Sequence, residues 1–307
     1  MTDTVTSASV ADESTTQGLL GAALAVTAWG AASIIPKAMD MGGMAIAVYR
    51  FALYFAVLVG WMAYRKAPFS VTAIRRSVLG GIALGLDIAL FFSAVKLTTV
   101  VNATIIGSLQ PILVGVVGVR FFGEKIKAID AVWSLVALAG VTAVVLSSSS
   151  TAESSVTGDL LAIGALFSWS AYFIASKQSK GSITPTEFTA GTAFWAFVIN
   201  LPLAIAFGQD LGRPSNGDLV KVVILAVVAG VIGHSLMNWS LVRIPLWIGS
   251  TFTLLIPVAS SLLAWAFLDE SLSWGQGIGM AVVIGSLAAI VVGQHRRKID
   301  QLEVAVP

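Results

Sequence analysis

The sequence predicts an all-α integral membrane protein with ten transmembrane helices, arranged as two inverted five-helix repeats. Three observations lead to this prediction. Of the 307 residues, 57% are hydrophobic and only 11% are charged, against roughly 25% charged in an average soluble domain. The apolar residues fall into ten runs, each long enough for a membrane-crossing helix of ~20 residues. The second half of the chain also repeats features of the first half at a nearly constant offset.

The ten spans follow from the length of each apolar run between polar breaks. We place them at 18–36, 44–64, 78–96, 100–120, 128–147, 159–178, 187–207, 219–241, 247–268 and 276–293. The remaining boundaries are a disordered N-terminal tail at 1–17, a first repeat at 18–147, a serine-rich linker at 148–158, a second repeat at 159–293 and a cytoplasmic C-terminal tail at 294–307. The N-terminal tail is polar and contains no lysine or arginine, so it does not resemble a secretory signal.

The repeat is visible in matched residues of the two halves. The segment 107–124 recurs 146 residues later as 253–270, and this places Pro111 on Pro257. At an offset of 140, three residues at the start of one half match three of the other: Gly18, Trp29 and Lys37 fall on Gly158, Trp169 and Lys177. Five spans per half is an odd number, so the second copy enters the membrane from the opposite side. Inverted repeats of this kind place a substrate site at their interface and predict alternating access.

Lysine and arginine are distributed unevenly between the two sides of the predicted bundle. Thirteen lie in the loops 2–3, 4–5, 6–7 and 8–9 or in the C-terminal tail, and four lie on the opposite side. Because cytoplasmic loops carry the excess of basic residues, both termini are predicted to face the cytoplasm.

Three ionisable side chains fall inside predicted spans: Arg50, Asp87 and His234. Such groups cost ~2.5–3.5 kcal/mol on insertion scales, so each needs a partner or a watery cavity. The offset of 146 maps Asp87 onto Gly233, next to His234, which puts the two at similar depths. They are candidates for binding the polar ends of a substrate or for relaying a proton. The alternative is that Asp87 pairs with Arg50 or Lys96 and holds helices together.

Aromatic and amide side chains complete the candidate site. Trp29 and Trp169 are related by the repeat and lie near mid-span, where they either line a substrate cavity or pack in the bundle core. Asn102, Tyr172 and Asn238 add hydrogen-bonding groups on the same set of helices. The hypothesis is that all of these line one polar cavity with aromatic walls.

Pro111 and Pro257 are the candidate hinges. Each proline lacks an amide hydrogen and crowds the carbonyl four residues earlier, on Gly107 and Thr253. The alternative for each is a static kink of the kind common in membrane helices.

Several classes of function have no support in the sequence. There is no cysteine, there are two histidines, and no nucleophile elbow, phosphate-binding loop or zinc-protease motif occurs. We therefore expect no enzyme activity, no catalytic residue, no cofactor and no metal. The basic residues lie in loops without interleaved aromatics, so nucleic acid is not an expected partner.

The duplicated unit, Trp29-Gly30 with Lys37, and Tyr49-Arg50-Phe51 resemble the EamA-type ten-helix branch of the drug/metabolite transporter superfamily. Within it the chain looks most like bacterial exporters of aromatic amino acids and methyl viologen. The resemblance implies that helices 1–4 and 6–9 enclose the cavity and that helices 5 and 10 are peripheral. The second half has Gly191-Thr192 near the place where the family usually has Arg-Phe, which leaves Arg50 without a symmetric counterpart.

The expected function is therefore export of small metabolites, first of all aromatic amino acids, across the bacterial inner membrane. The expected partners are the small-molecule substrate and the lipid bilayer. We expect a monomer, with a dimer as the alternative, and either proton coupling or substrate flow down its own gradient. Two other functions remain open: a sugar-phosphate or nucleotide-sugar carrier of the same superfamily, and a membrane enzyme or sensor.

Overall fold

The computed structural model describes residues 2–33, 35–67, 69–98, 100–147, 155–267 and 271–304, and all regular structure within them is helical. The elements are α1 (Thr2–Ser33), η1 (Ile35–Ala38), α2 (Gly43–Tyr64), α3 (Val71–Arg76), α4 (Val78–Leu97), α5 (Val100–Gly107), α6 (Gln110–Phe122), α7 (Ala128–Leu146), α8 (Val156–Gln178), α9 (Pro185–Ala206), α10 (Asn216–Ile224), η2 (Leu225–His234), α11 (Ser235–Leu241), α12 (Leu246–Phe252), α13 (Leu255–Phe267) and α14 (Trp274–Val304). Within these ranges the predicted all-α fold is confirmed.

Nine segments among the described residues are long and apolar enough to cross a membrane. The tenth predicted span, 18–36, is not among them, so the count of ten is not reproduced in full. Its apolar residues form the second half of α1, and the first half of that helix is polar. Ala22, Ala25, Val26 and Trp29 on this half are all buried, so the segment lies inside the bundle.

The N-terminal segment differs from the expected disordered tail at 1–17, because α1 already begins at Thr2. Residues 2–17 contain no glycine or proline, and a helix that the span has already nucleated extends at little further cost. The C-terminal tail likewise begins as helix, since α14 continues to Val304. The expected linker at 148–158 falls largely outside the described residues, and α8 starts at Val156.

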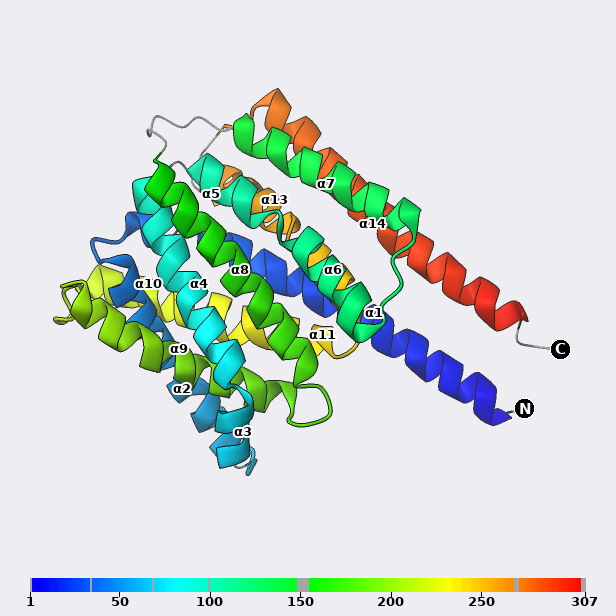
Figure 1. Ribbon diagram of the computed structural model, residues 1–307, viewed down its shortest axis with the longest axis horizontal. Helices are drawn as coiled ribbons and strands as arrows, with labels where there is room; N and C mark the ends of the chain where they lie inside the picture. Colours follow the sequence, from blue (N-terminus) through cyan, green and yellow to red (C-terminus); the bar gives the residue numbers. More distant parts are fainter. Residues whose placement is uncertain are drawn as a thin grey trace.

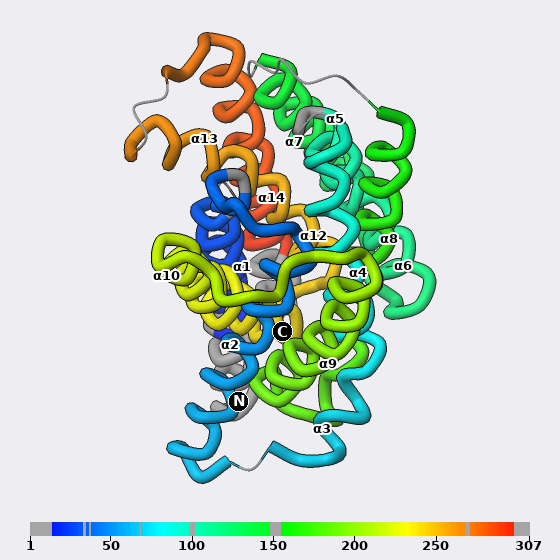
Figure 2. The backbone as a smooth tube through the Cα atoms, turned by 90° about the vertical axis from the view of Figure 1, so that its left-hand side faces the viewer, coloured from blue at the N-terminus to red at the C-terminus, as the bar shows by residue number. Residues whose placement is uncertain are grey.

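The two repeats pack with matched contacts. The outer pair α7 and α14 lie side by side in both views (Figures 1 and 2), and α2 packs on α9 and α6 on α12. Each of these pairs joins a span to its counterpart in the other repeat. The packing of α4 on α8 is matched by that of α1 on η2 and α11. Matched contacts of this kind are expected when a pseudo-two-fold axis relates the two repeats. The predicted spans 5 and 10, which are α7 and α14, lie at the periphery.

Close approach of α7 and α14 depends on a pair of glycines. A Cβ added at Gly140 would lie 2.9 Å from the carbonyl oxygen of Gly279, and a Cβ added at Gly279 would lie 2.7 Å from that of Gly140. The contact is reciprocal, as expected where two equivalent helices cross on a symmetry axis. Small residues at such crossings allow membrane helices to pack backbone against backbone.

The start of α1 and the end of α14 lie at the same end of the bundle, and the turn from α6 to α7 reaches that end as well (Figure 1). An even number of crossings, such as the predicted ten, would bring the two chain ends to one side. The arrangement therefore agrees with the parity on which the inverted repeat was predicted.

The spans that contain Pro111 and Pro257 are each interrupted near the proline, whereas Pro202 lies inside the continuous helix α9. Span 4 divides into α5 and α6, with Pro111 at the second residue of α6, and span 9 divides into α12 and α13, with Pro257 at the third residue of α13. The carbonyl of Thr253, expected to be freed by Pro257, instead accepts the Ile256 amide at 3.0 Å. Thr253 Oγ1 also donates to Gln110 Oε1 at 3.1 Å. The breaks of the two repeats thus contact each other across their interface.

Candidate functional site

The centre of the bundle contains an aromatic cluster drawn from both repeats. Trp29 of α1 and Trp169 of α8 meet edge to face, with ring centroids 5.0 Å apart and planes at 72°. His234, at the end of η2, lies 5.1 Å from the Trp29 ring and 6.1 Å from the Trp169 ring. Tyr172 stacks on Trp169 at 5.4 Å, and Phe173 contacts Trp169 at 4.8 Å. The structure therefore brings the two repeat-related tryptophans together with His234 and Tyr172.

Two glycines of η2 make room for the rings beside His234. A Cβ at Gly233 would lie 2.5 Å from Nε1 of Trp29, and a Cβ at Gly230 would lie 3.0 Å from the Tyr54 ring. The Trp29 indole donates to the carbonyl oxygen of Ala229 at 3.1 Å. The segment is a π-helix of ten residues, and π-helical turns are rare and concentrated at functional sites.

A directed chain of hydrogen bonds starts at Arg50. Arginine has only donors, so the contact of its Nη2 with His234 Nε2 at 3.3 Å makes Nε2 the acceptor. A neutral histidine then carries its proton on Nδ1, which lies 3.1 Å from the Tyr172 hydroxyl and donates to it. Tyr172 in turn donates to Asn238 Oδ1 at 3.0 Å. The donor–acceptor pattern thus defines one tautomer of His234 and one polarity for the chain.

The chain continues through Asn238 to the start of α9. Asn238 Oδ1 also accepts from Ser176 Oγ at 2.8 Å, and its Nδ2 donates to Thr189 Oγ1 at 2.9 Å. Thr189 donates onward to the carbonyl oxygen of Pro185 at 2.6 Å. Asn238 and Thr189 are almost fully buried, so the second repeat supplies a polar path inside an apolar bundle, and Arg50 of the first repeat lies at its far end.

Asp87 of α4 is buried close to this chain but makes no bond to it. Its exposed fraction is 8%, and that of Arg50 is 4%. Within the described residues no nitrogen of Arg50 or Lys96 lies within the 4.0 Å of an Asp87 oxygen that defines an ion pair. Lys96 instead donates to the carbonyl oxygen of Met41 at 3.3 Å. The pairing that we considered as the structural alternative for Asp87 is therefore not found.

Asn102 lies apart from the cluster. Its Nδ2 donates to both oxygens of Asp159, at 3.1 and 3.3 Å, and Thr98 donates to the same carboxylate at 2.7 Å. Asp159 and Trp169 are both on α8 and ten residues apart, which is about 15 Å of helix. Asn102 thus joins α5 to the first turn of α8.

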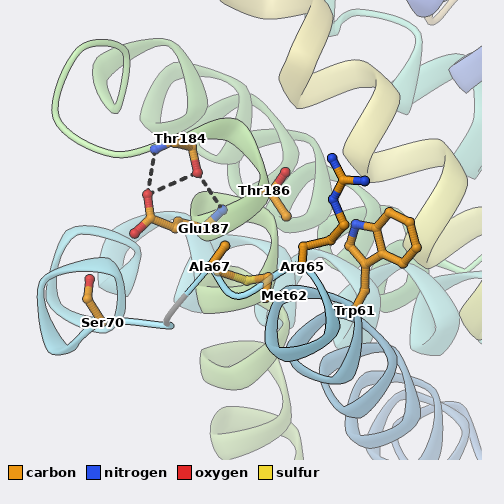
Figure 3. Close-up of a pocket in the computed structure, with 8 residues that line it drawn as sticks. All are labelled: Trp61, Met62, Arg65, Ala67, Ser70, Thr184, Thr186 and Glu187. Atoms are coloured by element: carbon orange, nitrogen blue, oxygen red, sulfur yellow. Dashed lines mark hydrogen bonds between the residues drawn. The ribbon is translucent and has the colours of Figure 1, made fainter.

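Two hollows lie where α9 begins. The larger, of about 630 Å³, is lined by the end of α2, with Trp61 and Arg65, and by the first turn of α9, with Thr186 and Glu187 (Figure 3). The smaller, of about 280 Å³, shares Thr186 and includes Ser235 and Trp239. Among the described residues, no predicted site residue lines either hollow. Pro185, at one end of the hydrogen-bond chain, lines the smaller hollow. The hydrogen bonds therefore connect this hollow to the buried Arg50 at their other end.

A loop arginine lies beside the smaller hollow. The Arg243 guanidinium lies 3.7 Å from the ring centroid of Trp239, a distance at which a cation is attracted to the face of an indole. Partial burial lowers the pKa of Arg243 below its ordinary value.

Sequence reasoning gave too little weight to Arg50 and missed Tyr54. The absence of a repeat-related arginine argued against a role for Arg50, yet it contacts His234 at the centre. Tyr54 stacks against the His234 ring with centroids 6.0 Å apart. Arg50 and Tyr54 are four residues apart on α2, a spacing that puts both on one helix face, and this was the available signal. No group of three or more histidine, cysteine, aspartate or glutamate side chains suited to a metal ion occurs in the described ranges.

The fold and the buried polar cluster define a multi-pass membrane transporter built from two repeats. The model of the EamA-like transporter family matches residues 16–146 and again 156–292, and the chain therefore belongs to this family. It is a transporter and not an enzyme, as the sequence predicted.

Three of its relatives match between 64% and 90% of the chain. A probable amino-acid metabolite efflux pump of Escherichia coli is 24% identical over 292 residues, covering 90% of this chain and 95% of the relative. The threonine/homoserine exporter RhtA of the same organism is 21% identical over 265 residues, covering 86% and 87%. The uncharacterized transporter YetK of Bacillus subtilis is 25% identical over 203 residues, a match that spans 64% of this chain and 62% of the relative. A solved crystal structure superimposes with a TM-score of 0.77 at 20% identity, covering 92% of this chain and 99% of that one, and shows the same fold.

Proposed function

We propose that this protein exports amino acids, aromatic ones first, across the bacterial inner membrane by alternating access. The observation that carries the proposal is the meeting of Trp29 and Trp169 against His234 at the interface of the two repeats. Repeat interfaces near the membrane midplane are where inverted-repeat transporters bind their substrates. Aromatic walls with hydrogen-bonding groups suit a substrate that has an apolar ring and polar ends.

Two relatives, a probable amino-acid metabolite efflux pump and a threonine/homoserine exporter, support the substrate class and the direction. The excess of lysine and arginine at the end that carries both termini supports a cytoplasmic location for that end. The hollows near Thr186 then face the cytoplasm, which is the side from which an exporter takes its substrate.

The breaks at Pro111 and Pro257 serve as hinges in this proposal. Each divides a span into two helices joined by a short turn, and the two breaks touch through Gln110 and Thr253. A change of angle at one break is thereby passed to the other repeat, as a transition between inward- and outward-open shapes requires. The protein works as a monomer in this scheme, because one chain supplies both repeats.

A phosphate-containing substrate fits the centre less well. Phosphates usually take several lysine or arginine side chains. Among the described residues, Arg50 is the one lysine or arginine that is buried. A sugar-phosphate or nucleotide-sugar carrier is therefore not favoured.

Counterflow into proteoliposomes tests the proposal. Purified protein is reconstituted, the vesicles are loaded with unlabelled tryptophan, and uptake of labelled tryptophan, phenylalanine or threonine is followed against protein-free vesicles. We expect saturable uptake that depends on the internal amino acid. Repeating the assay with and without an imposed pH gradient separates proton coupling from uniport. Uptake equal to that of protein-free vesicles for a broad amino-acid panel would refute the function.

A further inference from the structure

Among the residues that the structure describes, two buried side chains in contact with His234 and one buried acid on α4 have polar atoms without a hydrogen-bond partner. Arg50 Nε and the Tyr54 hydroxyl have no hydrogen-bond partner in the described part of the chain. Within the same residues the Asp87 carboxylate has neither a hydrogen bond nor an ion pair. All three side chains are at least nine-tenths buried, and we call them the unpartnered group.

The members of the unpartnered group are neighbours. Arg50 and Tyr54 are on α2, which packs against α4 with Asp87. Arg50 interacts electrostatically with both Tyr54 and Asp87, although it is not ion-paired with the acid. Arg50 Nε and the Asp87 carboxylate, which belong to side chains of opposite charge on two packed helices, are therefore both without a hydrogen-bond partner in the described residues.

This pattern is unusual for a structural feature. The large majority of buried polar side-chain atoms have a hydrogen-bond partner, and a buried charge without one is costly. Two opposite charges that served only to hold α2 and α4 together would be expected to pair directly. Because Arg50 and Asp87 are not paired, Arg50 Nε remains available as a donor and the Asp87 carboxylate as an acceptor.

We propose that the unpartnered group binds both charged ends of a zwitterionic amino acid, its carboxylate on Arg50 and Tyr54 and its ammonium on Asp87. This inference rests on the proposed function and names the chemistry by which it selects substrates. The guanidinium and the phenol supply donors to the carboxylate, and the Asp87 carboxylate accepts from the ammonium. Arg50 contacts His234, which packs against both tryptophans, so the substrate side chain extends toward the aromatic cluster.

A molecule that carries only one of the two charges leaves a buried partner unsatisfied. Each charge-assisted hydrogen bond to a buried group is worth enough to change affinity by about 10- to 100-fold. Tryptophan should therefore bind more tightly than tryptamine, which lacks the carboxylate, and than indole-3-propionate, which lacks the ammonium.

The test compares these three indole compounds on the full chain purified in detergent. Apparent affinity is taken from the ligand concentration dependence of thermal stabilisation, and counterflow of labelled tryptophan is measured in parallel. Wild type should prefer tryptophan about 10- to 100-fold over each analogue. In Asp87→Asn the preference over indole-3-propionate should disappear, and in Arg50→Gln the preference over tryptamine should disappear.

Asp130→Asn is the matched control. Asp130 is also a buried acid, but it lies on peripheral α7 and is paired with Arg297 at 2.7 Å and with Gln294 at 3.1 Å. This variant should keep the wild-type order of the three compounds. Equal binding of the three compounds by wild type, or an unchanged order in Asp87→Asn, would overturn the zwitterion site. The same change of order in Asp130→Asn would also overturn it.

Thermal stability without ligand provides a second readout. A ligand site predicts that Asp87→Asn unfolds at or above the wild-type temperature, because it removes an unpaired buried charge. A structural ion pair predicts a lower unfolding temperature. Zwitterion-selective binding without counterflow would refute export and leave the site standing, whereas counterflow without selectivity would refute the site alone. Binding of none of the three compounds would contradict both.

Discussion

Replacement of Glu124 by glutamine is expected to loosen the contact between repeats at the end of the bundle that carries the termini. Glu124 follows α6, and its carboxylate accepts the backbone amides of Leu246 at 2.6 Å and Trp247 at 3.1 Å, at the start of α12. Lys177 Nζ lies 3.6 Å from the same carboxylate and donates to the carbonyl oxygens of Leu241 and Ile244. One acid of the first repeat thus holds the turn between spans 8 and 9 of the second.

The magnitude follows from the bonds that glutamine cannot make. Its one carbonyl oxygen replaces one of the two amide contacts, and its NH₂ group faces the other amide as a second donor. Loss of one charge-assisted hydrogen bond costs about 2–3 kcal/mol. The Lys177 amine lies 3.6 Å from the carboxylate and keeps its bonds to the carbonyl oxygens of Leu241 and Ile244 in the variant, so the cost comes from the lost amide bond. The equilibrium between the intact contact of residue 124 with α12 and its opened form should therefore shift toward the opened form by about 30- to 150-fold.

A single cysteine reports on this opening, because the natural chain has none. Ser250 lies on α12 beyond the Glu124 contact and is fully buried, so Ser250→Cys should react slowly with a maleimide. Adding Glu124→Gln to Ser250→Cys should raise the rate of maleimide labelling, by up to about 30- to 150-fold.

Glu187→Gln is the matched control for this measurement. Glu187 also accepts a backbone amide, that of Thr184 at 2.8 Å, in the exposed capping box drawn in Figure 3, and it connects no repeats. Unchanged labelling in Glu124→Gln, or an equal rise in Glu187→Gln, would refute the reasoning.

Two further predictions concern the packing and polarity of the centre. Gly233→Ala places a Cβ 2.5 Å from the Trp29 indole nitrogen. The overpacking, about 1–3 kcal/mol, should lower both the unfolding temperature and the counterflow rate. Gly285→Ala is the control, because a Cβ there has nothing within 4 Å, and it should lower neither. Tyr172→Phe removes the group between His234 Nδ1 and Asn238, and the buried donor left behind should cost about 1–3 kcal/mol in chemical unfolding. A smaller loss in Tyr172→Phe than in Ser176→Ala, which removes a second donor to the same amide oxygen, would contradict the proposed direction of the chain.

The fold was largely predictable because bilayer thickness and helix geometry leave few options. Apolar runs of about 20 residues give the spans, and the repeat offsets with the odd parity give the arrangement. The breaks near Pro111 and Pro257 were placed less well, since proline marks where a helix is weakened but not whether it bends or ends. Nothing in the residues of η2 predicted a π-helix. Its glycines at 230 and 233 have a purpose only in relation to Tyr54 and Trp29, which are distant in sequence.

The candidate site was partly predictable, for a reason that the repeat makes clear. Trp29 and Trp169 were identified because they are related by the repeat and lie near mid-span, and the structure brings their rings into contact. Arg50 breaks the symmetry, so the same reasoning undervalued it. Asn102 was grouped with the site because it adds a hydrogen-bonding group on the same set of helices, but the sequence alone does not say which residue it bonds. The structure supplies Asp159, from the start of another helix.

Photoaffinity mapping tests most directly whether the interface of the repeats is the substrate site. Labelled azido-phenylalanine is bound to the reconstituted protein, activated by light, and located by mass spectrometry, with excess unlabelled amino acid as the competitor. We predict competable labelling of peptides that contain Trp29, Trp169 and His234. Competable labelling confined to other segments, such as the hollow near Trp61 and Thr186, would contradict the account.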